Sequence, residues 1–154
     1  MRVHHSLEMG GTGTTIRAMV PAHPDEACPM ALSAKHLPLA GCSILLVENE
    51  PVVAQSVADC LQDAGAFVLT AWHIKDALSM VERSRLSAAV LDLEFGDDDT
   101  TVVCRHLTER GVPFLFYSGY DDAYVSDKWP GATVVIKPAG EQVLIAALSE
   151  LIGR

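Results

Sequence analysis

Residues 88–99 read AAVLDLEFGDDD, and this stretch decides how the rest of the chain is interpreted. Its short, continuous apolar run predicts a strand that is buried on both faces. An unpaired carboxylate is costly inside a core, so Asp92 at the end of the run needs a partner or a function. In open α/β sheets, ligand sites lie just outside the carboxyl ends of the strands. The stretch therefore predicts a buried strand that brings Asp92 to a candidate site.

Four further apolar runs alternate with amphipathic segments in the rest of the chain. The other strands are expected at residues 43–47, 67–70, 113–117 and 133–136. The helices are expected from Pro51 to Gly65, over 74–81, from a cap at Asp99 to Gly111, weakly over 120–129, and over 143–151. Five strands that alternate with five helices imply parallel βαβ units and a three-layer α/β domain.

Polar residues stand at the points where the apolar strands end. The carboxyl ends of parallel strands lie at one edge of a sheet, so residues that are distant in sequence meet there. The polar residues after the first, third, fourth and fifth strands are Glu48, Asn49, Asp92, Ser118 and Lys137. We therefore expect these five side chains to share one pocket.

The residue types in this pocket favour phosphoryl chemistry. Two carboxylates about 4 Å apart repel by about 4 kcal/mol at an effective dielectric constant of 20. A lysine relieves this repulsion, and so does Mg²⁺, which oxygen-only ligands favour. An ionised Asp92 is able to attack a phosphoryl donor and form an acyl phosphate. Mg²⁺ and Lys137 would stabilise the transferring oxygens, and Ser118 would hydrogen-bond one of them.

The composition is that of an acidic globular protein. The 154 residues are 49% hydrophobic and 20% charged, with a formal net charge of −9. This charge, with 11 Lys and Arg residues, argues against direct binding to nucleic acid. The four cysteines have no Cys-x-x-Cys spacing, so we expect free thiols in a reducing cytoplasm. No stretch has the length of a transmembrane helix, so no membrane contact is expected.

Residues 1–41 differ from the rest of the chain. They contain a Gly/Thr-rich stretch and four prolines, and they have no sustained hydrophobic period. We therefore expect a flexible N-terminal extension over residues 1–41 and a folded domain over residues 42–154.

Four short motifs, taken together, resemble the receiver domains of two-component response regulators. In chain order they are LVENEP at 46–51, LD at 91–92, FYSGY at 116–120 and IKP at 136–138. The resemblance implies a flavodoxin-like (βα)5 fold, in which a five-stranded parallel sheet has the strand order 2-1-3-4-5. It also implies a cis peptide bond between Lys137 and Pro138, which X–Pro bonds permit.

The resemblance assigns a role to each polar residue by its position. It implies that Asp92 is the phosphoacceptor, Ser118 the switch hydroxyl and Lys137 the phosphate-contacting lysine. It also implies a Mg²⁺ site whose acidic pair follows the first strand. The implied ligands of this Mg²⁺ are Glu48, Asn49, Asp92 and the backbone carbonyl of Glu94.

Two residues depart from the family pattern. Asn49 stands where the second residue of the acidic pair is usually Asp, so one charge is lost and the Mg²⁺ affinity should fall. Val134 stands three residues before the lysine, where the family usually has an aromatic switch residue. The usual coupling between hydroxyl and aromatic ring is therefore in question, and Tyr117 or Tyr120 is the candidate substitute.

The function that the resemblance implies is that of a stand-alone receiver in a phosphorelay. A histidine kinase or histidine phosphotransfer protein would phosphorylate Asp92, and the domain would signal through contact with a downstream protein. No enzymatic activity is expected beyond Mg²⁺-dependent self-phosphorylation and self-dephosphorylation. The kinase would dock early in the first helix, at Pro51, Val52, Gln55 and Ser56.

Three alternatives remain. The departures at Asn49 and Val134 keep open a degenerate receiver that acts as a phosphorylation-independent protein-binding module. An aspartyl phosphatase is less favoured. Resemblance to those enzymes would require an Asp-x-Asp motif on the first strand, where this chain has Glu48-Asn49-Glu50. A nucleotide-binding Rossmann domain is weaker still, because no Gly-rich turn follows the first strand.

Overall fold

The chain divides into two compact units, residues 1–33 and 34–154. The computed structural model describes residues 3–7, 14–18, 37–94, 100–119 and 122–153. In the first unit, strand β1 (Val3–Leu7) pairs antiparallel with β2 (Thr14–Ala18), and Val3 is the partner of Ala18. No sequence pattern predicted this pair, and the flexibility of residues 1–41 stays a prediction.

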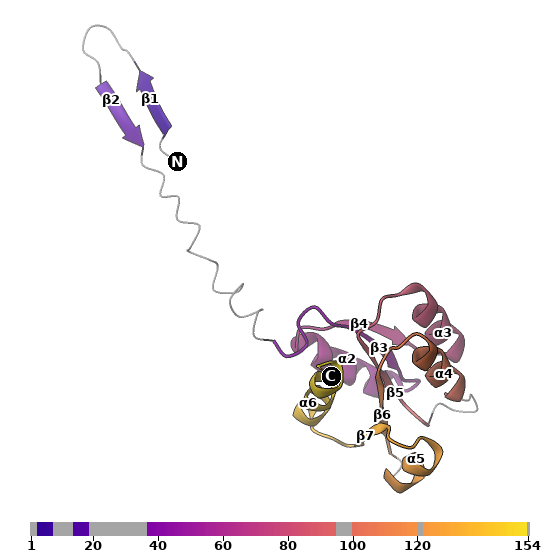
Figure 1. The fold of residues 1–154 in the computed structure, drawn as a ribbon. Coiled ribbons are helices and arrows are strands. Elements are labelled where there is room, and N and C mark those ends of the chain that lie inside the picture. The colour runs from indigo at the N-terminus through magenta and orange to yellow at the C-terminus, as the bar shows by residue number, and fades with distance from the viewer. Residues whose placement is uncertain (1–2, 8–13, 19–36, 95–99, 120–121, 154) are drawn as a thin grey trace. The chain divides into compact units, whose positions relative to one another are not determined.

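The second unit is built on a sheet of five parallel strands in the spatial order β4-β3-β5-β6-β7 (Figure 1). The strands are β3 (Ser43–Val47), β4 (Phe67–Ala71), β5 (Ala88–Leu91), β6 (Phe114–Ser118) and β7 (Thr133–Ile136). Counted within this unit, the order is 2-1-3-4-5. The predicted flavodoxin-like (βα)5 fold is therefore confirmed.

Each strand of this sheet is followed by a helix. The helices are α2 (Pro51–Asp63), α3 (Ile74–Arg83), α4 (Thr101–Glu109), α5 (Asp122–Lys128) and α6 (Glu141–Ile152). The short α5 corresponds to the segment whose helical pattern was weak. The expected cap Asp99 lies outside the described residues, and Thr100 is the residue that precedes α4.

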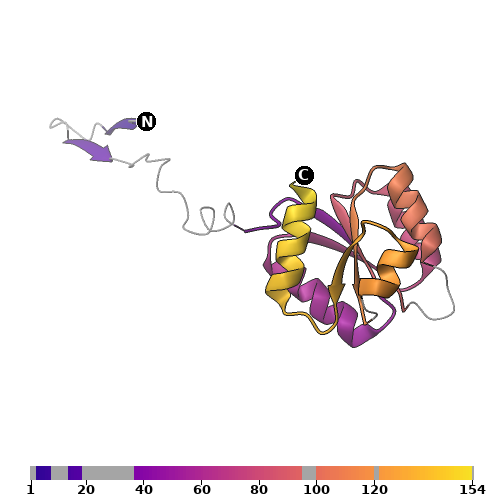
Figure 2. The same cartoon turned by 60° about the horizontal axis from the view of Figure 1, so that its bottom comes forward.

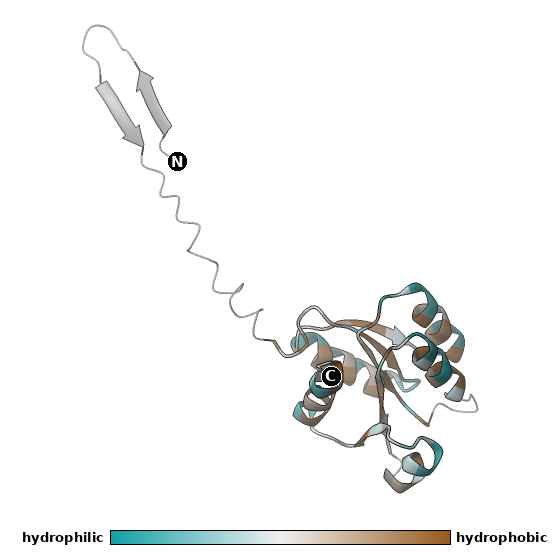
Figure 3. Cartoon of the chain, in the orientation of Figure 1, coloured by the Kyte–Doolittle hydropathy of each residue, from teal (hydrophilic) through white to brown (hydrophobic). Residues whose placement is uncertain are grey.

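Helices cover both faces of the sheet, which makes three layers (Figure 2). Successive side chains of a strand point to opposite faces, and β3 shows this alternation. Ile44 and Leu46 pack with α2 and α6, whereas Leu45 and Val47 pack with α3 and α4. All four side chains are at most 1% exposed. The central strands are accordingly apolar along their length, while the helices carry both apolar and polar residues (Figure 3).

The segment before the first strand of the sheet also belongs to the core. Leu39 is fully buried, and its N–H donates to the carbonyl of Ala64 at 2.9 Å. Gly65 follows with a φ of +96°, and a Cβ there would lie 3.0 Å from the Cβ of Leu37. Glycine therefore suits both the turn after α2 and the close approach of this segment. The packed residues thus begin before Cys42, where the sequence placed the start of the domain.

The described cysteines and helices can be compared with the predictions of free thiols and of no transmembrane helix. Cys42, Cys60 and Cys104 are free thiols, while Cys28 lies outside the described residues. Across the described ranges, no helix has the length and apolar character needed to span a membrane. A reducing cytoplasm stays a prediction.

The closing helix offers a direct test of the core. Leu144 is 2% exposed and packs in the cluster beneath α2 and α6. We expect Leu144→Ala to lower the free energy of unfolding by about 2–5 kcal/mol, because it removes buried methyl groups and leaves a cavity. Urea denaturation measures this loss. Val143→Ala is the control, since Val143 is 56% exposed and its truncation should change stability by about 0.5 kcal/mol or less.

Candidate functional site at the carboxyl edge of the sheet

Backbone hydrogen bonds beyond the strands hold the residues of the candidate site in register. The N–H of Asp92 donates to the carbonyl of Val47 at 3.0 Å, which places the end of β5 beside the end of β3. The N–H of Lys137 donates to the carbonyl of Ser118 at 2.9 Å, which joins the ends of β7 and β6 in the same way. The sheet therefore brings residues that are far apart in sequence to one edge, as the apolar runs predicted.

Lys137 bridges two buried carboxylates at this edge. Its Nζ lies 2.8 Å from Oε2 of Glu48 and 3.3 Å from Oδ2 of Asp92. Glu48 is 2% exposed and Asp92 is 4% exposed, while the lysine side chain is 18% exposed. One cation thus lies between two anions that are almost removed from water.

Backbone N–H groups satisfy the second oxygen of each carboxylate. Oε1 of Glu48 accepts a hydrogen bond from the N–H of Glu50 at 3.0 Å, and Oδ1 of Asp92 accepts one from the N–H of Glu94 at 2.9 Å. Both bonds run from a side chain to the residue two positions later, a turn typical of acidic residues that follow a strand. Each carboxylate is therefore fixed by one backbone donor and by the lysine.

Burial and charge shift the pKa values of two of these groups. Burial raises the pKa of Glu48, and repulsion from Asp92 adds to this, while the hydrogen bonds from Lys137 and from the N–H of Glu50 oppose it. The net pKa of Glu48 is raised. Burial lowers the pKa of Lys137, but the hydrogen bonds and negative charges of Glu48 and Asp92 outweigh burial, and the net pKa is raised. Lys137 is therefore held as the ammonium ion.

The other predicted site residues lie around this bridge. Ser118 is fully buried at the end of β6, at the same edge as Asp92. Asn49 is exposed beside Glu48. Glu94 is exposed as well. Its side chain reaches the turn after β6, because a Cβ on Gly119 would lie 3.4 Å from Oε2 of Glu94. The expected cis bond between Lys137 and Pro138 is present.

Two contacts at the site were not predicted from the sequence. Thr100 is 4% exposed, and its hydroxyl donates to the backbone carbonyl of Asp92 at 3.2 Å. The Nζ of Lys137 lies 5.4 Å from the centre of the Tyr117 ring. The sequence signals for them were weak: a threonine before a helix and an aromatic residue before Ser118. Neither pattern specifies which residue is the partner.

Tyr117, one candidate substitute for an aromatic residue at position 134, packs on the face of the sheet opposite to Val134. Val134 is the strand partner of Phe116 and packs on the α3 and α4 side of the sheet. Tyr117 is the partner of Val135 and packs on the α2 and α6 side. Tyr120, the other candidate substitute, lies outside the described residues.

The oxygen donors at this edge fit Mg²⁺ in kind. Mg²⁺ is usually bound by one or two carboxylates, with waters and phosphoryl oxygens completing an octahedron. Glu48 and Asp92 offer two carboxylates, and each oxygen has lone pairs beyond the one hydrogen bond given above. Within the described ranges, no group of three or more His, Cys, Asp and Glu residues is placed to hold a metal. The ligand set that includes Asn49 and the carbonyl of Glu94 therefore stays a prediction.

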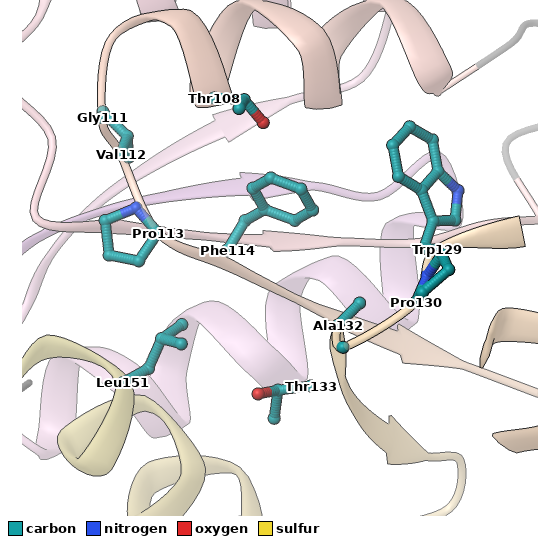
Figure 4. A pocket seen from close by; sticks show the side chains of 11 residues that line it. Thr108, Gly111, Val112, Pro113, Phe114, Trp129, Pro130, Ala132, Thr133 and Leu151 are labelled. Carbon is teal, nitrogen blue, oxygen red and sulfur yellow. The ribbon is translucent and has the colours of Figure 1, made fainter.

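A hollow of about 500 Å³ lies at the opposite edge of the sheet (Figure 4). Phe114 and Thr133, at the starts of β6 and β7, line it together with Thr108, Trp129 and Leu151. None of the predicted site residues lines this hollow. The candidate chemistry is therefore assigned to the carboxyl edge, on the basis of its charged groups.

Comparison with solved structures identifies similar folds. A response regulator receiver protein from Sinorhizobium medicae WSM419 is 25% identical, with a TM-score of 0.67 over 73% of this chain and 94% of that chain. A sensor protein from Polaromonas sp. JS666 is 23% identical, with a TM-score of 0.67 over 73% of this chain and 97% of that chain.

A third similar structure is the receiver domain of a sensor histidine kinase from Pseudomonas aeruginosa PAO1, with a magnesium ion coordinated in its active site cleft. It is 24% identical, with a TM-score of 0.66 over 75% of this chain and all of that chain. No protein-family model and no curated protein matches the chain.

Removing the bridging lysine tests the electrostatics of the site. We expect Lys137→Met to lower the free energy of unfolding by about 3 kcal/mol near neutral pH, because it leaves two buried carboxylates without their cation. The loss should shrink as the pH falls from about 8 to about 5. Without the lysine the pKa of Glu48 rises further, so the folded state of the variant takes up a proton that the unfolded chain does not bind. Urea denaturation across this pH range measures both effects.

The control for this variant is Lys128→Met, which removes an exposed lysine from α5. Its stability should change by about 0.5 kcal/mol or less at every pH. Equal losses in the two variants, or a loss in Lys137→Met that does not depend on pH, would contradict the bridge.

Proposed function

Because the chain has the fold of response-regulator receiver domains, we propose that it is a phosphoacceptor receiver in a two-component phosphorelay, with Asp92 as the phosphoacceptor. The observation that best supports this role is the placement of Asp92. Its carboxylate is buried at the carboxyl edge of the sheet and fixed at 2.9 Å to the N–H of Glu94 and at 3.3 Å to Lys137. A carboxylate that is oriented and kept beside a cation is suited to nucleophilic attack on phosphorus.

In the proposed reaction, a carboxylate oxygen of Asp92 forms a bond to phosphorus as the bond to the donor group breaks. With a phosphohistidine donor, the P–N bond breaks and the imidazole nitrogen leaves with the electron pair. The Nζ of Lys137 lies closer to Glu48 than to Asp92, at 2.8 Å against 3.3 Å. The hydrogen bond to Oδ2 of Asp92 is therefore the weaker one, and it breaks more easily when this oxygen attacks phosphorus. The ammonium then faces the developing charge on the phosphoryl oxygens. Bound Mg²⁺ would supply further neutralisation of these oxygens.

A histidine kinase or histidine phosphotransfer protein is the proposed phosphoryl donor. One similar structure is the receiver domain of a sensor histidine kinase, which supports a partner of this kind. The proposed docking residues stand on α2, which begins three residues after Glu48. Val52 is 77% exposed, and Pro51, Gln55 and Ser56 are exposed beside it. An exposed apolar residue next to the site is suited to contact with a protein.

Phosphodonor labelling tests the proposed nucleophile. We expect the wild-type protein to be labelled by a small phosphodonor such as acetyl phosphate in the presence of Mg²⁺. Asp92→Asn should not be labelled, because an amide cannot form the acyl phosphate. Phosphate-affinity gel electrophoresis measures the labelled fraction, and treatment with hydroxylamine should remove an acyl phosphate.

The matched control is Asp127→Asn, which makes the same change at an exposed position of α5. It should be labelled like the wild type. Labelling that persists in Asp92→Asn, or a wild-type protein that takes no label with Mg²⁺ and donor, would refute the proposed role.

A second candidate function is a degenerate receiver that binds partners without phosphorylation. The observation that favours it is the hydrogen bonding of the two carboxylates. Asn49 adds no charge, and the carboxylates of Glu48 and Asp92 are each satisfied by Lys137 and a backbone N–H. Such a site is stable without a metal, so weak Mg²⁺ binding would leave it unreactive.

The variant Asn49→Asp separates the two candidates. We expect it to bind Mg²⁺ about 30-fold more tightly than the wild type, because one added negative charge about 4 Å from a divalent cation is worth about 2 kcal/mol at a hydrated position. Mg²⁺ titration followed by tryptophan fluorescence measures the affinity, and acetyl phosphate labelling follows the reaction. If the wild type is a weakened receiver, labelling rises together with the affinity.

The control for Asn49→Asp is Gln62→Glu, which adds the same charge at an exposed position near the end of α2. It should leave Mg²⁺ binding unchanged. A wild type without binding at millimolar Mg²⁺, together with an Asn49→Asp variant that takes no label, would favour the degenerate receiver.

A further inference from the structure

We infer that Tyr117 is a positioning residue for the reaction: its ring holds the ammonium of Lys137 between Glu48 and Asp92. The inference rests on the proposed function and extends it to a residue for which the family motifs give no role. It starts from one contact, in which the Nζ of Lys137 lies 5.4 Å from the centre of the Tyr117 ring. A cation within about 6 Å of an aromatic ring is attracted by the negative face of the ring.

The fold holds the Tyr117 ring in a defined position. Tyr117 lies within β6 and is the strand partner of Val135, two residues before Lys137. Its ring is partly buried and packs against the cluster formed by α2, α6 and the sheet. The ring is therefore held by core packing, and it meets a lysine whose backbone is bonded to the residue after Tyr117.

Lys137 needs such a contact because its side chain is long and is partly exposed to solvent. A lysine has a flexible four-carbon stem, and its ammonium is a point charge without a preferred direction of bonding. The side chain is 18% exposed and stands just after the edge strand β7. The two carboxylates attract the ammonium, and the Tyr117 ring adds a third attractive contact. The ring thus restricts the positions from which Lys137 faces a phosphoryl group on Asp92.

The same geometry gives two adjacent residues of β6 separate tasks. Side chains alternate along a strand, so Tyr117 and Ser118 point to opposite faces of the sheet. Ser118 is the proposed switch hydroxyl, whereas Tyr117 contacts the lysine. The usual aromatic switch position holds Val134, on the face opposite to Tyr117. In this chain the ring of Tyr117 therefore contacts the lysine from the face opposite to Val134.

The test uses Tyr117→Leu and Tyr117→Phe in the full chain. In the wild type, NMR should show the Lys137 side-chain protons next to Nζ shifted upfield by the ring current of Tyr117. Tyr117→Leu should lose this shift and slow acetyl phosphate labelling by about 2- to 30-fold, which corresponds to cation–π energies of about 0.5–2 kcal/mol. Tyr117→Phe keeps the ring and should retain both the shift and the rate.

The matched control is Phe114→Leu, which removes a partly buried ring from the other end of β6 and from the other face. It should keep the Lys137 shift and the wild-type labelling rate. The inference is overturned if the wild type has no ring-current shift, if Tyr117→Leu labels like the wild type, or if Tyr117→Phe loses as much as Tyr117→Leu. A wild type that shows the shift but takes no label would refute the proposed function and leave the contact itself established.

Discussion

The site depends on one cation that bridges two buried carboxylates. Glu48 and Asp92 are nearly removed from water, and together they would repel strongly without Lys137. The lysine is shared unequally, at 2.8 Å and 3.3 Å, so Asp92 is the less tightly held partner. With one positive and two negative side chains the bridge has a net charge of −1. One negative charge is therefore left uncompensated, and it would attract a further cation.

The parallel sheet makes this arrangement possible, and it also ties the site to the stability of the whole domain. The three residues of the bridge come from the ends of three strands, and two backbone hydrogen bonds beyond the strands set their register. No local segment contains the site, so its geometry exists only when β3, β5, β6 and β7 are all paired. A core substitution such as Leu144→Ala should therefore lower the population of intact sites without touching any residue of the bridge.

The sequence was a good guide to this edge because the relevant signals are local. Short apolar runs that end in a polar residue predict buried parallel strands, and the common edge of the strands then brings Glu48, Asp92 and Lys137 together. The contacts that were missed join residues whose separation no short pattern encodes. Leu39 packs before the expected boundary, Thr100 bonds to the backbone of Asp92, and Tyr117 lies against Lys137. Each of these depends on how the chain packs in three dimensions.

The charge count of the site also indicates when a metal would matter most. Asn49 leaves the edge with one negative charge fewer than the resemblance to receiver domains implies, so the attraction for Mg²⁺ would be weaker. A phosphoryl group on Asp92 would add between one and a half and two negative charges at about neutral pH, placed where Lys137 is already shared with Glu48. One lysine cannot neutralise that increase, so the phosphorylated site would bind Mg²⁺ more tightly than the unmodified site. In the proposed receiver, Asn49 would keep the affinity for Mg²⁺ weak before phosphorylation. The charge of the phosphoryl group would then raise this affinity.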